Sequence, residues 1–130
     1  MPDPRWLYIV LFILSPAIAG MDPLPDAPVM TGLVVWYDIP GGVMRNGQRY
    51  DATAATCAVD DAQYSQLAGE VLIVCTAMSI DGRCVTCHVS DSGYLADYGV
   101  VADVTPALFR ALVGPLGVGV AQVQIWEVNQ

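Results

Sequence analysis

The stretch Glu70–Ser90, EVLIVCTAMSIDGRCVTCHVS, indicates two β-strands joined by a hairpin loop. Its first part, Glu70–Ala77, is a nearly continuous apolar run that is too short for a good helix and suits a strand covered on both faces. The dipeptide Asp81-Gly82 is the strongest hairpin signal in the chain. Arg83–Ser90 then returns as the partner strand, so we expect a fold built mainly from strands.

Further short strands are expected on both sides of this hairpin. Leu33–Tyr37 is β-branched and aromatic, Val100–Val104 is another β run, and Ala121–Ile125 alternates apolar residues with Gln. Many short strands with few helical segments between them are typical of a small barrel.

One short helix is well specified near the C-terminus. Thr105 can cap it, Pro106 suits its first position, and Gly114 ends it. Because Leu108 and Leu112 lie four residues apart and share a face, we expect the helix to pack on the barrel.

Residues 6–19, WLYIVLFILSPAIA, have the form of a secretory signal. An apolar run follows Arg5, Pro16 breaks it, and the small-x-small pattern AIA ends at Ala19, after which we expect cleavage. The protein is therefore expected to be secreted or to lie in the cell envelope. The alternative is an uncleaved anchor, in which case the protein contacts a membrane only through this segment.

The rest of the chain divides into a Pro-rich linker, residues 20–30, and one folded domain, residues 31–130. The formal net charge of the 130-residue chain is −8, because 13 Asp and Glu stand against 5 Arg and no Lys. This balance argues against a nucleic-acid partner, which needs a basic surface, and against docking on anionic lipid. Since 55% of the residues are hydrophobic and 14% charged, we expect a folded chain rather than a disordered one.

The chain has four cysteines, namely Cys57, Cys75, Cys84 and Cys87. In an oxidising compartment we expect two disulfides, and three pairings are open. A two-residue hairpin loop places Thr76 opposite Cys87, with Cys75 diagonal to Cys87, and Cys57 then reaches across to the hairpin. The rival interpretation is a zinc site, because Cys84-x-x-Cys87 is followed by His88. Export favours disulfides, so we expect neither a metal nor a cofactor.

Four segments occur in an order that resembles one known family. An aromatic strand comes first, and residues 45–51, RNGQRYD, are similar to the family's "ANGE-x-YD" segment. Residues 89–93, VSDSG, are similar to the "V-x-DRG" motif, and residues 101–109, VADVTPALF, to "IDLSpaAF". Over roughly residues 31–128 the chain resembles the double-psi β-barrels of the rare lipoprotein A-like and expansin-like group. This resemblance implies a small six-stranded, mainly-β barrel with one short helix, preceded by the apolar signal helix.

The resemblance also implies polysaccharide chemistry at two carboxylates. Rare lipoprotein A-like proteins are lytic transglycosylases of peptidoglycan that use a His and the Asp of "DRG", which Asp91 matches. Asp103 matches the Asp of the expansin "FDLS" motif, with which expansins loosen polysaccharide without clear hydrolysis. The family's His falls at Val59, and Ser92 replaces the Arg of "DRG". The acid/base pair used for glycoside cleavage is therefore incomplete, and enzymatic activity stays open.

The polar candidates also have structural interpretations. Asp91 precedes a Ser-Gly pair, where an Asp often accepts backbone N–H groups in a turn, and Asp103 lies close to the start of the expected helix. Asp60 and Asp61 are expected in a solvated loop. His88 lies three residues before Asp91 on one strand, so alternation places the two side chains on opposite faces unless a bulge intervenes.

Three aromatic residues are candidates for sugar binding, namely Trp36, Tyr37 and Tyr50. Alternation along the first strand sends either Trp36 or Tyr37 into the core. We interpret the protein as an exported double-psi barrel of the cell envelope that binds or remodels peptidoglycan or a related polysaccharide without hydrolysis, because the family's His is missing. The alternatives are an active lytic transglycosylase that uses Asp91 and a purely structural barrel in a surface or virion assembly.

Overall fold

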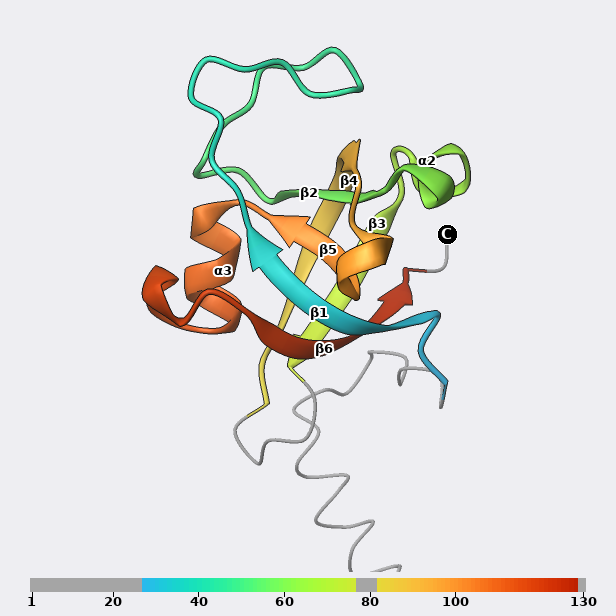
Figure 1. The fold of residues 1–130 in the computed structure, drawn as a ribbon, viewed down its shortest axis with the longest axis vertical. Helices are drawn as coiled ribbons and strands as arrows, with labels where there is room; N and C mark the ends of the chain where they lie inside the picture. The colour runs from blue at the N-terminus through green and yellow to red at the C-terminus, as the bar shows by residue number, and fades with distance from the viewer. Residues whose placement is uncertain (1–26, 77–81, 129–130) are drawn as a thin grey trace, which may run out of the picture.

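The computed structural model describes residues 27–76 and 82–128 of the chain. Within these ranges six strands form a closed barrel in the order β1-β5-β2-β4-β3-β6 (Figure 1). The strands are β1 (Met30–Trp36), β2 (Thr56–Asp60), β3 (Val71–Thr76), β4 (Cys84–Gly93), β5 (Val100–Val104) and β6 (Ala121–Glu127). The expected mainly-β barrel is confirmed, whereas the expected signal segment, residues 1–19, lies outside the described residues.

Short helices connect the strands in the described ranges. They are α2 (Asp61–Leu67), the 3-10 helix η1 (Ala96–Tyr98), α3 (Pro106–Leu112) and the 3-10 helix η2 (Leu116–Val118). The α3 helix is the one predicted: Pro106 begins it, and Leu108 N donates to Thr105 Oγ1 at 3.4 Å. None of the described helices combines the length and apolar character that a membrane crossing requires.

The α2 helix was not expected, because Asp60 and Asp61 were placed in a loop. Asp60 instead ends β2 and caps the helix by accepting a hydrogen bond from Ala62 N at 3.0 Å. Unlike α3, this helix has no Pro at its start and buries only Leu67, so the capping Asp is the main local signal of this helix.

The core lies inside the barrel and is closed by α3. Parallel pairing joins β1 to β5 and β2 to β4, and the other neighbouring strands are antiparallel. Alternate residues of each strand, such as Val34 and Val59, point inward and are fully buried. Phe109 of α3 is also fully buried in the same cluster. Truncation of Phe109 to Ala would cost about 3–5 kcal/mol of stability.

Two disulfides cross-link the barrel, as expected. Cys57 of β2 is bonded to Cys87 of β4, so Cys57 reaches the hairpin, and Cys75 is bonded to Cys84. All four sulfur atoms are therefore in disulfides, which leaves no Cys thiolate for the rival zinc site.

The hairpin between β3 and β4 has a different register from the one predicted. Cys75 lies directly opposite Cys84, and Thr76 N donates to the carbonyl oxygen of Arg83 at 2.9 Å. The loop is therefore longer than two residues, and the prediction of Thr76 opposite Cys87, with Cys75 diagonal to Cys87, is wrong: Cys87 lies opposite Leu72. The β3 strand also pairs with β6, and β4 also pairs with β2, so barrel closure constrains this register together with the turn.

Candidate functional site

The two candidate acids lie on one row of the outer face of the barrel. Ala58 of β2 pairs with Asp91 of β4 on one side and with Asp103 of β5 on the other. Its neighbours Cys57 and Val59 belong to the core, so Ala58 faces outward. Directly paired residues share a face, so both acids face outward too, with Cα atoms about 10 Å apart, or two strand spacings. We call this set, Asp91, Ala58 and Asp103, the acid row.

A bulge in β4 brings Asp91 to this face. The pairing of β2 with β4 shifts between Cys57, which pairs with Val89, and Ala58, which pairs with Asp91. Ser90 is therefore the extra residue of the bulge. Without it Asp91 would be one step further along β2 and would point into the core.

The same bulge changes the relation of Asp91 to the only His of the chain. His88 is exposed and pairs with Thr56, which lies on the same face of β2 as Ala58. The prediction that His88 and Asp91 lie on opposite faces is therefore wrong. Val59, at the position that matches the family's His, is fully buried in the core.

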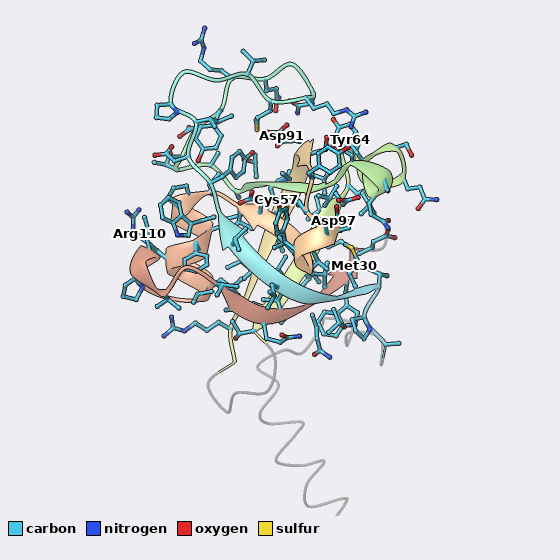
Figure 2. All side chains as sticks on the ribbon, in the orientation of Figure 1. Met30, Cys57, Tyr64, Asp91, Asp97 and Arg110 are labelled. Atoms are coloured by element: carbon cyan, nitrogen blue, oxygen red, sulfur yellow. A yellow bond between two sulfur atoms is a disulfide. The ribbon has the colours of Figure 1, made fainter. Side chains whose placement is uncertain are left out.

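Asp91 is held by three hydrogen bonds. Its Oδ2 accepts from the Tyr37 hydroxyl at 3.0 Å, and its Oδ1 accepts from Arg45 N and from Ser92 N, each at 3.0 Å. Tyr37 and Arg45 belong to the 37–55 loop, which connects β1 to β2 and lies above β2 in Figure 1. Asp91 therefore fastens this loop to the barrel, at the end of β4 that faces the loop in Figure 2.

Asp103 is in a different situation. It is partly buried, and its Oδ1 is buried with no hydrogen-bond partner among the described residues. Burial, and in second place the charge of Asp91, raise the pKa of Asp103 to about 6. Both its protonated and its ionised forms are therefore accessible between mildly acidic and neutral pH.

Tyr37 and Tyr50 pack together beside the acids. Their ring centroids are 5.2 Å apart, and the Tyr50 hydroxyl donates to the Tyr37 carbonyl oxygen at 2.5 Å. Burial, and then nearby carboxylates, raise the pKa of both phenols, that of Tyr50 to about 12. Both therefore act as neutral hydrogen-bonding groups. Tyr50 is only 6% exposed, so it supports Tyr37 rather than offering a ring surface.

Trp36 is separated from this group by strand alternation. It packs against the core cluster, and its Nε1 donates to the Leu116 carbonyl oxygen of η2 at 3.0 Å. Of the two neighbouring aromatics, Trp36 is therefore the one on the core side, and Tyr37 is the one at the acids.

Arg45 is a site residue that the sequence reasoning did not single out. Its Nη1 donates to Ser92 Oγ at 2.8 Å and lies 3.7 Å from Asp61 Oδ1, and its guanidinium carbon lies 4.3 Å from the ring centroid of Tyr64. The side chain thus ties the 37–55 loop to α2 and to the end of β4. The one sequence feature that could have identified Arg45 is its position at the start of the segment that resembles "ANGE-x-YD".

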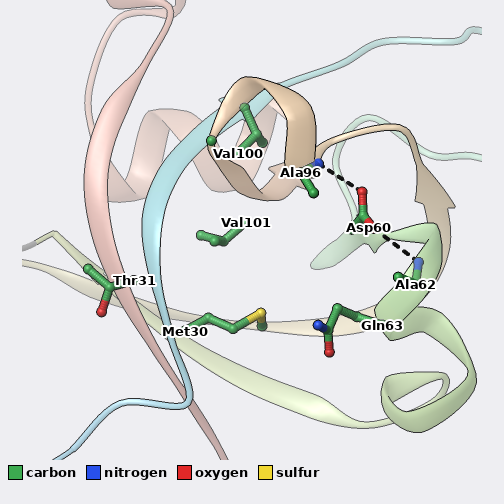
Figure 3. A pocket seen from close by; sticks show the side chains of 9 residues that line it. Met30, Thr31, Asp60, Ala62, Gln63, Ala96, Val100 and Val101 are labelled. Carbon is green, nitrogen blue, oxygen red and sulfur yellow. Dashed lines mark hydrogen bonds between the residues drawn. The ribbon is translucent and has the colours of Figure 1, made fainter.

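A cavity of about 340 Å³ lies elsewhere, beside β1, α2 and η1 (Figure 3). Its one carboxylate, Asp60, accepts hydrogen bonds from the backbone N–H groups of Ala96, Ala62 and Leu95 at 2.8–3.0 Å. These bonds, that from Ala96 first, lower the pKa of Asp60 below its ordinary value. This carboxylate is occupied in holding the backbone, so the acid row remains the stronger candidate site.

Comparison with protein-family models gives no match, and comparison with curated proteins gives none. Among solved structures, Streptomyces papain inhibitor matches with a TM-score of 0.62 at 23% identity, over 82% of this chain and 100% of that one. A mutant of the Clavibacter michiganensis expansin in complex with cellohexaose matches with a TM-score of 0.61 at 20% identity, over 76% of this chain and 50% of the expansin. The fold is an expansin-like double-psi β-barrel. The finer resemblance to rare lipoprotein A-like proteins stays a prediction.

This expansin-like barrel presents two carboxyl groups with different chemical capacities. Asp91 is fixed by three donors, one of which is the neutral phenol of Tyr37. Asp103 has an unpartnered oxygen and a raised pKa, so it can accept a hydrogen bond when ionised or donate one when protonated. The face is thus suited to binding hydroxyl groups.

Proposed function

We propose that this chain is an exported barrel that binds a cell-envelope polysaccharide at the acid row, with peptidoglycan as the first candidate, and does not hydrolyse it. The observation that carries the proposal is the unpartnered, buried Oδ1 of Asp103. The expected structural role of this residue at α3 is filled by Thr105, whose side chain caps the helix. A half-buried carboxyl without a structural partner lowers stability, and a ligand hydroxyl would supply the missing hydrogen bond.

The surroundings of Asp103 match a neutral, hydroxyl-rich ligand. The carboxyl groups can accept from sugar hydroxyls, and the phenol of Tyr37 lies beside them. Beyond the acid row, Tyr94 follows Gly93, which pairs with Asp60 at the end of β2; Tyr94 is 81% exposed and offers a ring face for stacking. Such contacts need no positive charge on the protein, in agreement with its net charge of −8.

Export is supported by two features of the chain. The two disulfides are typical of proteins in oxidising compartments outside the cytoplasm. Residues 6–19 have the composition of a secretory signal. A polymer of the cell envelope is a ligand that an exported barrel would meet.

The alternative is lytic cleavage of the same polymer. It is favoured by the pKa of Asp103, raised to about 6, which suits a general acid, and by the common face of His88 and Asp91. Against it, the described hydrogen-bond partners of Asp91 are Tyr37, Arg45 and Ser92, so no imidazole is bonded to this carboxylate. This is why we favour binding over cleavage.

The binding proposal is tested by sedimentation of the purified protein with insoluble peptidoglycan and, in parallel, with cellulose. We expect retention of the wild type, and a two- to tenfold weaker retention, roughly, in Asp103→Asn, because Asn keeps an acceptor oxygen but turns a charge-assisted hydrogen bond into a weaker neutral one. Asp97→Asn removes the same charge from an exposed site in η1 and should bind like the wild type. A wild-type protein that stays in the supernatant with both polymers would contradict the proposal and favour a purely structural barrel.

Lytic cleavage is tested on the same peptidoglycan by measuring the release of soluble anhydro-sugar products. We expect none from the wild type. Release by the wild type that disappears in Asp91→Asn would establish the lytic alternative in place of simple binding.

A further inference from the structure

A groove of about 600 Å³ lies next to the acid row. The residues that line it include Asn46 and Gln48 of the 37–55 loop, Thr56 of β2 and His88 of β4. Thr56 and His88 pair directly across the two strands, so their side chains share one face. The groove is thus built from a second pair on the outer face of the barrel, with the loop as its wall.

The groove and the acid row are neighbours on the same face. Thr56 and Ala58 are two residues apart on β2, which corresponds to about 7 Å. The loop is hydrogen-bonded to β4 beside both: Arg45 N donates to Asp91 Oδ1 at 3.0 Å, and Asn46 N donates to the carbonyl oxygen of Ser90 at 3.1 Å. A linear polymer that lies along β2 would therefore contact the groove and the acid row in succession.

The lining of the groove mixes polar side chains with Ala, Gly and Val. Among the described residues that form it there is no Asp, Glu, Lys or Arg. The Thr56 Oγ1 atom is buried without a hydrogen-bond partner among the described residues, so the fold leaves its hydrogen-bonding capacity unused. Asn46 Nδ2 donates to Gln48 Oε1 at 3.0 Å, and this bond fixes the two amides and leaves the amide N–H groups of Gln48 to donate.

We propose that this groove is a second sugar subsite, which binds an uncharged sugar unit while the neighbouring unit of the same chain lies on the acid row. The proposal rests on the proposed function and adds the class of ligand, a neutral glycan backbone rather than an acidic polymer. Hydroxyl and N-acetyl groups match the neutral donors and acceptors of the lining. An anionic sugar would meet no Lys or Arg in the groove and would be repelled by the net charge of −8.

The test is an NMR titration of the exported, tag-free protein with the neutral hexasaccharides cellohexaose and chitohexaose. His88 is the only His of the chain, so its imidazole signals report on the groove, while the backbone amides of Asp91 and Asp103 report on the acid row. We expect both sets of signals to move along one saturation curve. Thr56→Val removes the unpartnered hydroxyl and should weaken binding about two- to tenfold, whereas Thr31→Val, at an exposed position of β1, should not.

The outcomes separate this inference from the proposed function. If the acid-row amides move while the His88 signals stay fixed and Thr56→Val binds like the wild type, the groove subsite is wrong and the proposed function stands. If neither set of signals moves although the protein sediments with peptidoglycan, the subsite for a neutral sugar is wrong and the proposed function stands; if it also fails to sediment with either polymer, both are wrong. If hexagalacturonate, which is anionic, moves the His88 signals as strongly as cellohexaose does, the assignment of a neutral ligand is wrong.

Discussion

Replacement of Asp103 by Asn is expected to stabilise the barrel at neutral pH and to have little effect in acid. Burial, together with the charge of Asp91, raises the pKa of Asp103 from its ordinary value of 3.8 to about 6. Between these two values the folded protein keeps a proton that the unfolded chain has lost, so this group makes stability fall as the pH rises. Below 3.8 both states are protonated and the penalty disappears. Asn has nearly the same shape and cannot ionise, so it removes the penalty.

The size of the effect follows from the two pKa values. At 1.36 kcal/mol per pH unit, the increase from 3.8 to about 6 corresponds to an upper limit of about 3 kcal/mol. Asp103 is partly exposed, and water screens both its burial and its repulsion by Asp91. We therefore expect Asp103→Asn to raise the free energy of unfolding by about 1–2 kcal/mol at pH values above its folded-state pKa.

The assay is urea unfolding with both disulfides intact, at pH values from about 3.5 to about 7.5. The quantity compared is the difference in unfolding free energy between the variant and the wild type at each pH, because other acids contribute equally to both. Asp97→Asn corrects for the general gain from lowering a net charge of −8. If the difference in unfolding free energy is independent of pH, or equals that of the Asp97→Asn control, then burial and the charge of Asp91 do not destabilise ionised Asp103, and the reasoning is refuted.

Three further predictions test the cross-link, the cap of α2 and the loop. The disulfide between Cys57 and Cys87 closes a separation of 30 residues, and the double replacement by Ala should lower the free energy of unfolding by about 3–4 kcal/mol in urea titrations. Asp60→Asn should lower the thermal midpoint of unfolding at neutral pH, because hydrogen bonds to the ionised carboxylate lower the pKa of Asp60 and stabilise the fold. In thermal scans the difference between the variant and the wild type should shrink as the pH falls below 3.8, the ordinary pKa of Asp. Arg45→Met should speed hydrogen exchange of the amides in the 37–55 loop while global stability changes little, and unchanged exchange would refute its role as the tie of that loop.

The barrel was predictable because its parts carry local signals. The apolar run of β3, the alternation of β6 and the capped start of α3 each depend on a few neighbouring residues. The hairpin register was not predictable in the same way. The Asp81-Gly82 signal concerns one loop, whereas the observed pairing of Cys75 with Cys84 must also fit the pairing of β3 with β6 and of β4 with β2.

The candidate site was predictable as a set of residue types but not as an arrangement. The motif positions pointed to Asp91 and Asp103, and the structure places them on either side of Ala58. Simple alternation predicts the wrong relative faces for His88 and Asp91, because Ser90 forms a bulge between them. No residue of that segment is an obvious sequence signal for a bulge. Arg45 and the groove also depend on the path of the 37–55 loop, which the sequence does not specify beyond its turn residues.

The charge distribution around the acid row gives an independent reason to connect it with a ligand. In the described part of the chain the one ion pair joins Arg45 to Asp61, and the guanidinium of Arg45 contacts Ser92 and Tyr64 rather than either acid of the row. Asp103 is therefore partly buried beside another carboxylate without a cation, an arrangement that costs stability. A neutral side chain of the same size would fill this position with less strain, so the fold itself does not require an acid there. A side chain that lowers the stability of its own fold is expected where the residue serves binding or chemistry rather than folding. Asp91 is well bonded and Asp103 is not, so Asp103 is the residue on which the proposed function depends most.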